Sequence, residues 1–87
     1  MNRVLRAVIT HLLSKRCIGG KHTPEDKLIK SKAKWIDKKE NKQFQKEYST
    51  FKKEGFIICL KKRTGKSFDW HISLNPRKLK ELHEIIK

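Results

Sequence analysis

Apolar side chains at the start of the chain recur at intervals of three and four residues, which is the spacing of one helix face. They predict an amphipathic helix over residues 3–16, with Lys15 and Arg16 in its last turn, where positive charge favours the helix dipole. The inward stripe of this helix consists of Val4, Leu5, Val8, Ile9, Leu12 and Leu13.

A signal for a second helix follows a pair of glycines. Thr23 suits the N-cap and Pro24 the first helical position, and two acidic residues come next, in the first turn. We expect this helix to be short, because Leu28 and Ile29 are followed by a lysine-rich stretch.

A third helix is predicted over residues 38–54. Asp37 and Glu40 have the spacing of a capping box, and Gly55 is typical of the residue that follows the end of a helix. The inward stripe of this helix consists of Phe44, Tyr48 and Phe51.

The period then changes from helical to alternating. Residues 56–60 form a short apolar run, residues 63–66 read as a turn, and residues 68–74 alternate between apolar and polar, which together predict a β-hairpin. The register is open between a two-residue turn at Thr64-Gly65 and a bulged loop. The face expected on the core carries Phe68, Trp70, Ile72 and Leu74.

Asn75 and Pro76 repeat the cap-and-proline signal and predict a final helix. We expect this helix to cover the hairpin and the first helix, with a homodimer formed through it as the alternative. Its inward side chains are Leu79, Leu82, Ile85 and Ile86. The chain is therefore expected to be a single α+β domain over residues 1–87, in the order helix, helix, helix, hairpin, helix.

Positive charge adds a functional expectation to this outline. The chain has 23 Lys and Arg against 9 Asp and Glu, which gives a formal net charge of +14. Self-repulsion on this scale destabilises a compact chain, and nucleic acid is the polyanion that we expect to relieve it. Heat-adapted proteins raise Glu together with Lys, whereas Glu lags far behind here. Lys outnumbers Arg by 18 to 5, which favours phosphate contacts over base reading.

A membrane partner is not expected. No apolar run approaches the length of a bilayer span, and no helix combines a broad basic face with exposed Trp, Phe and Leu. The interrupted apolar stretch at the N-terminal end lacks a cleavage site, so we expect no signal peptide and a cytoplasmic location.

Three helices followed by a hairpin with a basic tip resemble the winged helix-turn-helix fold. The resemblance rests on the short capped helix from Thr23, the long helix over residues 38–54, and the hairpin over residues 56–74. Residues 53–58, Lys-Glu-Gly-Phe-Ile-Ile, are similar to the junction between recognition helix and wing in many bacterial and archaeal members. Many members also have a short strand between their first two helices, which only Cys17-Ile18 is expected to supply.

Two further segments resemble very short, basic archaeal winged-helix proteins, for which the resemblance implies no activity. These are residues 19–23, Gly-Gly-Lys-His-Thr, and residues 73–77, Ser-Leu-Asn-Pro-Arg. The winged-helix resemblance implies that the third helix enters a major groove and that the hairpin, as the wing, contacts backbone or minor groove.

Helical geometry predicts a basic face on the third helix, opposite its apolar stripe. Lysines at such spacings repel one another, so the face does not serve helix stability, and phosphate contact is weighed against a merely solvated face. Its members are Lys39, Lys42, Lys46, Ser49 and Lys53, with Gln43 and Thr50 alongside, and Lys38 at the start of the helix is a further candidate contact. Gln43, Ser49 and Thr50 are the candidates for base contacts.

The hairpin tip is the second candidate contact. It concentrates four charges around a glycine turn, on Lys61, Lys62, Arg63 and Lys66. A wing that contacts nucleic acid is weighed here against a tip whose lysines only protect an edge strand.

The aromatic side chains could stack on unpaired bases, but their spacing favours the core. We expect Tyr48, Phe68 and Trp70 to be buried. Trp35 lies with Ile36 in the connection before the third helix, where we expect the two to anchor the chain to the core, and Trp35 is the best candidate for exposure.

Neither a metal site nor an enzyme is expected. Cys17 and Cys59 are far apart in sequence, and the four histidines form no metal-ligand spacing with them. Free thiols are the default, and a disulfide is the alternative for a hyperthermophile. The acidic residues are scattered and no glycine loop has a phosphate-cradling pattern, so we expect no cofactor.

Duplex-DNA binding through the third helix and the hairpin is the function that we expect, as in a transcription regulator or a chromatin protein. A ribosomal or ribosome-associated protein that binds rRNA is the close alternative, because Lys serves both partners. A protein-interaction adaptor that uses its charge on an acidic partner is the third.

Overall fold

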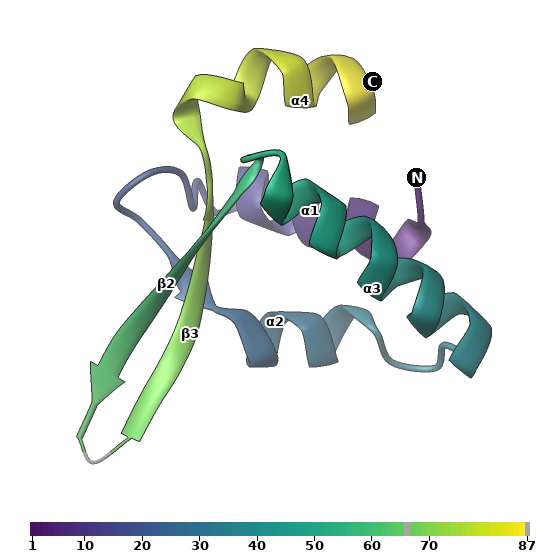
Figure 1. The fold of residues 1–87 in the computed structure, drawn as a ribbon, viewed down its shortest axis with the longest axis horizontal. Helices are drawn as coiled ribbons and strands as arrows, with labels where there is room; N and C mark the ends of the chain where they lie inside the picture. The colour runs from purple at the N-terminus through teal and green to yellow at the C-terminus, as the bar shows by residue number, and fades with distance from the viewer. Residues whose placement is uncertain (66, 87) are drawn as a thin grey trace.

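Over residues 1–65 and 67–86, which the computed structural model describes, the chain forms four α-helices and a three-stranded antiparallel sheet (Figure 1). The elements are α1 (Arg3–Ser14), β1 (Thr23–Pro24), α2 (Glu25–Lys32), α3 (Lys38–Lys53), β2 (Ile57–Thr64), β3 (Ser67–Leu74), a 3-10 turn (Pro76–Lys78) and α4 (Leu79–Ile86). The α+β class and the order of helices and hairpin agree with the prediction, and one short strand is added.

The first helix begins and buries its side chains as its pattern predicts. Asn2 is its N-cap, and the side-chain oxygen of Asn2 accepts hydrogen bonds from the backbone N–H groups of Val4 and Leu5. The buried stripe consists of Val4, Leu5, Val8, Ile9 and Leu12. α1 ends at Ser14, two residues before the predicted end.

The start of the second helix differs from the prediction. Thr23 and Pro24 form β1, which pairs with Ile72 and His71 of β3, and the first helical residue is Glu25. Thr23 is therefore not the N-cap, because its backbone is extended to complete the sheet. The strand expected at Cys17-Ile18 is also misplaced, since Ile18 makes only an isolated bridge to Leu74.

Side-chain and glycine caps set the other helix ends as predicted. Asp37 Oδ1 accepts a hydrogen bond from the backbone N–H of Glu40 at 2.8 Å. Gly55 follows α3 with φ of 84°, a left-handed conformation that suits glycine. Asn75 Oδ1 accepts a hydrogen bond from the Arg77 N–H, and Asn75 Nδ2 donates one to the Gly55 carbonyl. Asn75 thus starts the last helical segment and ties it to the end of α3.

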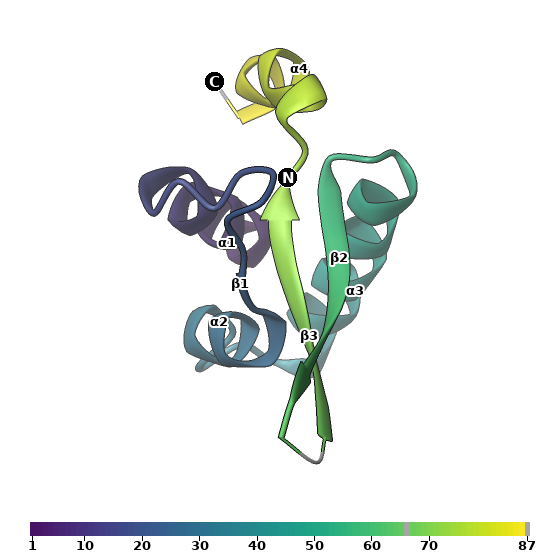
Figure 2. The ribbon, with the colours of Figure 1, turned by 90° about the vertical axis from the view of Figure 1, so that its left-hand side faces the viewer.

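The sheet has the order β1-β3-β2, and its hairpin is much longer than the core that it covers. Residues 71–74 of β3 are buried, whereas residues 67–70 are exposed. The outer half of the hairpin therefore projects past α2, as Figure 2 shows. The sequence left the hairpin register open, and the pairing of Thr64 with Ser67 rules out the two-residue turn at Thr64-Gly65. Lys66, one of the candidate contacts at the tip, lies outside the described residues.

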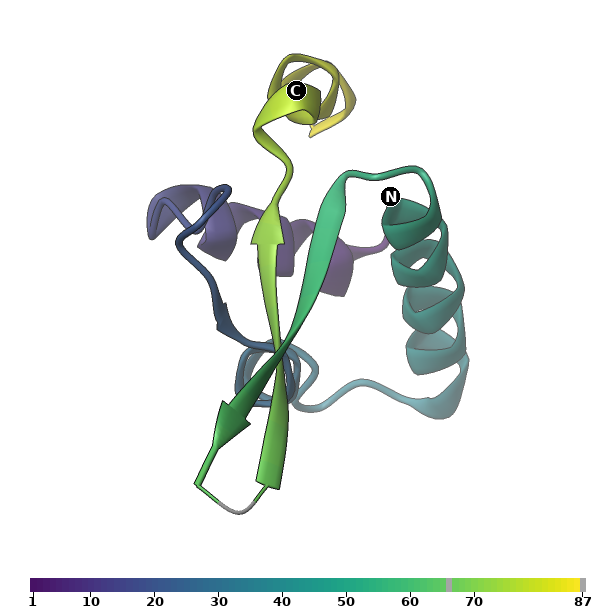
Figure 3. The same ribbon diagram turned by 60° about the vertical axis from the view of Figure 1, so that its left-hand side comes forward.

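α4 lies across the end of the molecule opposite the hairpin tip (Figure 3). Leu82 is only 1% exposed and belongs to the core cluster, and Leu79 and Ile86 pack against that cluster. Ile85 was expected to face inward, but it is 45% exposed, because Leu82 and Ile86 occupy the buried side. No helix in the described part of the chain is long and apolar enough to cross a membrane.

Candidate nucleic-acid interface

The outer face of α3 carries exposed polar and basic side chains along its whole length. The opposite face is held in the core by Phe44 and Tyr48, which are 0% and 4% exposed. Since these two side chains fix the rotation of the helix, the eight predicted residues are placed outward. All are exposed: Lys38, Lys39, Lys42, Gln43, Lys46, Ser49, Thr50 and Lys53.

The two flanks of α3 separate the candidates for base contact. Gln43 and Thr50 border a hollow with Glu47 and Phe51, on the flank away from α2. The Thr50 hydroxyl already donates a hydrogen bond to the Lys46 carbonyl, one turn earlier. Gln43 and Thr50 therefore lie apart from the α2 side of the helix.

The flank of α3 that faces α2 holds the remaining candidate. Ser49 lines a hollow of about 390 Å³ between the two helices, together with Gln45 on α3 and Asp26 and Ile29 on α2. Gln45 was not predicted as a site residue, because the stripe was defined by its lysines. Its place one turn before Ser49 was the signal that could have identified it.

The hairpin register divides the basic tip between two faces. Lys61 pairs with Trp70 and Arg63 with Phe68, so these four side chains share one face. Lys62 pairs with Asp69 and lies on the other face. Lys61, Lys62 and Arg63 are all exposed.

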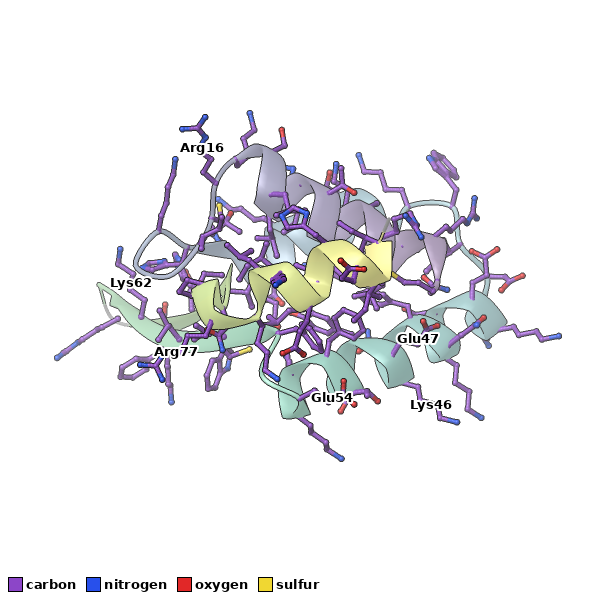
Figure 4. All side chains as sticks on the ribbon, turned by 90° about the horizontal axis from the view of Figure 1, so that it is seen from above. Arg16, Lys46, Glu47, Glu54, Lys62 and Arg77 are labelled. Carbon is purple, nitrogen blue, oxygen red and sulfur yellow. The ribbon has the colours of Figure 1, made fainter. Side chains whose placement is uncertain are left out.

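The two candidate elements lie at opposite ends of one side of the molecule. In Figure 1 the hairpin tip is at the lower left and the start of α3 at the lower right, with α2 along the edge between them. Figure 4 shows that Arg16, between α1 and β1, also points outward, on a different side from Lys46 of α3 and Lys62 of the hairpin. The charge is therefore not confined to one patch.

The carboxylate of Glu25 connects α2, α3 and β2 beside this surface. Its Oε2 accepts a hydrogen bond from the Tyr48 hydroxyl at 2.5 Å and lies 2.8 Å from Lys52 Nζ. The Cys59 thiol lies 3.9 Å from the same oxygen. Sequence reasoning missed this cluster and gave Glu25 only a role at the helix start, because its partners come from two other elements, α3 and β2.

The charges within this cluster stabilise each other. Burial by itself would raise the pKa of Glu25, but hydrogen bonds from Lys52 and Tyr48 outweigh burial and lower that pKa. Burial would lower the pKa of Lys52, but the hydrogen bond and charge of Glu25 raise it. The pair therefore stays ionised around neutral pH. The charge of Lys52 is balanced by Glu25. Lys52 is therefore a weaker candidate for a phosphate contact than the exposed Lys42 and Lys46.

Three aromatic side chains are exposed, and of these Trp35 was the one named as the candidate for exposure. Trp35 is 96% exposed, Phe68 57% and Trp70 52%. The prediction of a buried Phe68 and Trp70 was wrong, because the alternating pattern of β3 continues beyond the end of the core. Trp35 is exposed at a φ of 66° and does not anchor the connection, whereas Ile36 does pack against the core.

A histidine pair was also missed by the sequence reasoning. His22 Nδ1 lies 2.8 Å from His71 Nδ1, and the two rings are edge to face. Burial, together with the charges of His22 and Lys62, lowers the pKa of His71. The pair is joined by no third ligand: no group of three or more His, Cys, Asp or Glu among the described residues could hold a metal ion. Cys17 and Cys59 are both free thiols.

No protein-family model, curated protein or solved structure matches this chain.

Proposed function

We propose that the chain is a winged-helix protein that binds duplex DNA through the outer face of α3 and the projecting hairpin. The fold part of this proposal is supported by the element order α1-β1-α2-α3-β2-β3 and by the sheet order β1-β3-β2. In a winged helix, α3 is the recognition helix and the β2–β3 hairpin is the wing.

The observation that carries the function is the exposed lysine series on α3. Lys39, Lys42, Lys46 and Lys53 are exposed along one side of a helix whose other side is buried in the core. Each Lys that contacts a phosphate releases condensed counterions, so binding is driven by salt-sensitive electrostatics. Contacts of this kind position a duplex without reading its sequence. In the cell, such a protein would be associated with the nucleoid.

The double substitution Lys42→Ala and Lys46→Ala tests this proposal. We expect the slope of log affinity against log salt for a blunt duplex to fall by about two units, and affinity to fall about tenfold at moderate salt. The measurement is fluorescence anisotropy across a salt series. The matched control is Lys15→Ala with Lys80→Ala, which removes the same total charge from exposed positions at the C-cap of α1 and on α4. Equal slopes for the two variants would contradict the role of α3.

The spread of charge over several sides favours a second candidate, an rRNA-binding protein. A protein embedded in folded RNA meets phosphates on more than one side, and Arg16, Lys46 and Lys62 extend on different sides (Figure 4). The same salt series with a structured RNA separates the two. Tighter RNA binding at physiological salt would place the protein at the ribosome, and weak, salt-tolerant binding to both would favour a protein partner.

A further inference from the structure

The projecting half of the hairpin carries an aromatic and basic face that we name the hairpin aromatic face: Lys61, Arg63, Phe68 and Trp70. The register places these side chains on the same side of the ribbon as Cys59 and Ile72, which lie against the core. This face is therefore the core face of the hairpin, continued beyond the point where the helices cover it.

The two rings of the hairpin aromatic face lie mostly outside the core. Phe68 and Trp70 are more than half exposed, so much of their apolar surface adds nothing to the core. Lys61 Nζ lies 4.6 Å from the Phe68 ring centre and 6.0 Å from that of Trp70. Both rings therefore have a positive charge beside them. Exposed apolar surface with charged neighbours is typical of an interaction site.

The surroundings of Trp70 are hollowed on the side of the helices. One hollow of about 280 Å³ lies between β3 and the start of α2 and is lined by Trp70, Asp69, Pro24, Asp26, Lys27 and Lys30. A second of about 340 Å³ is lined by Trp70, Glu25, Lys52 and Cys59. Trp70 therefore borders space in which a planar group can lie beside its ring.

We propose that Phe68 and Trp70 stack on unpaired bases of a single nucleic-acid strand whose phosphates contact Lys61 and Arg63. The inference rests on the proposed nucleic-acid binding and deepens it. Bases in a duplex are already stacked on each other, so exposed rings can use only unpaired bases, as in single-strand binding surfaces. The net charge of +14 and the cations on this face favour a polyanion over an apolar protein segment.

Two oligomers of equal charge test this inference. The first is an oligothymidylate of about ten nucleotides, and the second is an abasic oligomer of the same length, which has the phosphates without the bases. The chain has two tryptophans, so Trp35→Phe leaves Trp70 as the sole reporter. We expect oligothymidylate to quench the emission of Trp70 and to bind about tenfold or more tighter than the abasic oligomer.

Substitutions of the rings locate the effect. Phe68→Ala and Trp70→Ala are each expected to weaken oligothymidylate binding by about 5- to 100-fold in anisotropy and to leave abasic binding unchanged. Trp35→Ala is the matched control at a tryptophan elsewhere, which is 96% exposed, and it should keep the preference. A thermal melt of each variant confirms that the domain is folded.

The outcomes separate this inference from the proposed function. Equal binding of the two oligomers by the unaltered protein, with duplex binding intact, would overturn the stacking and leave the α3 proposal standing. Equal weakening of both oligomers by Trp70→Ala would also overturn it, since the ring would then act only on the shape or charge of the hairpin. Loss of salt-sensitive binding to every nucleic acid would overturn the proposed function itself.

Discussion

Leu82→Ala is expected to lower the free energy of unfolding by about 2 to 4 kcal/mol. Leu82 is 1% exposed and joins α4 to the core cluster, so its removal leaves a cavity beneath α4. A chain of this length is stable by only about 4 to 13 kcal/mol, which makes the loss a large share of the total. Urea unfolding at neutral pH, followed by circular dichroism, measures it.

Ile85→Ala is the matched control on the same helix. Ile85 is 45% exposed, and its truncation is expected to change the free energy of unfolding by less than about 1 kcal/mol. Equal losses from the two substitutions would contradict the placement of α4, because they would mean that Ile85 is as well packed as Leu82.

The same pair of variants addresses a homodimer through α4. Ile85 is the large apolar side chain of this helix that remains exposed, and any dimer formed there would bury it. Analytical ultracentrifugation at micromolar concentration would then find a dimer that Ile85→Ala weakens. A monomer at that concentration would reject the dimer and leave α4 with its role in the core alone.

The helices could be predicted from the sequence where a local signal sets them. Asp37, Gly55 and Asn75 each act through atoms within a few residues of their own position, and each caps a helix as expected. The buried stripe of α3 follows from spacing alone, because Phe44 and Tyr48 fix which side is inward. The outward position of the lysines on α3 is a consequence of the same geometry.

The features that could not be predicted depend on contacts between elements that are far apart in the sequence. The Thr23-Pro24 pair has the local signal of a helix start, but pairing with β3 makes it a strand. Phe68 and Trp70 continue a strand pattern that is correct for residues 71–74, and only the extent of the core decides that they are exposed. The alternating pattern predicts on which face of the strand a side chain lies, but it does not predict how many residues of that face the core covers.

The site shows the same limit. Ser49 and Gln45 share a hollow with α2, whereas Gln43 and Thr50 lie on the other flank. The helical wheel gives the angle of each residue but not the side on which α2 packs. The cluster around Glu25 could not be predicted either, because Tyr48, Lys52 and Cys59 contact Glu25 only after α2, α3 and β2 have packed together.

Glu25→Ala is expected to cost about 2 to 3 kcal/mol of unfolding free energy. Tyr48 is 4% exposed, and its hydroxyl would lose the carboxylate that accepts its hydrogen bond. Lys52 would lose its ion-pair partner, although its partly exposed ammonium can reach water. Glu25 begins α2, and both Tyr48 and Lys52 lie on α3. Loss of these contacts is therefore also expected to weaken the packing of α2 against α3 beside the hollow between them.

Glu25→Gln and Asp26→Asn form the matched pair that isolates the cluster. Both remove a negative charge from the first turn of α2, where it favours the helix dipole. Only Glu25 pairs with Lys52, so the extra cost of Glu25→Gln over Asp26→Asn, expected to be about 1 kcal/mol, measures the buried interaction. Equal costs would show that the dipole accounts for both.

The difference in unfolding free energy between wild type and Glu25→Gln is expected to depend on pH, and the directions of two pKa shifts, those of Glu25 and Lys52, determine how. The pKa of Glu25 is lowered in the folded state, so its contribution is complete above the unfolded value near 4.5 and is lost as pH falls through the folded value. The pKa of Lys52 is raised, so its contribution is complete below the unfolded value of 10.5 and is lost as pH rises through the folded value. Urea titrations at several pH values should therefore give a plateau in the difference between wild type and Glu25→Gln, with losses at both ends. A difference that stays constant into strong acid would mean that the charge of Glu25 does not hold α2, α3 and the hairpin together.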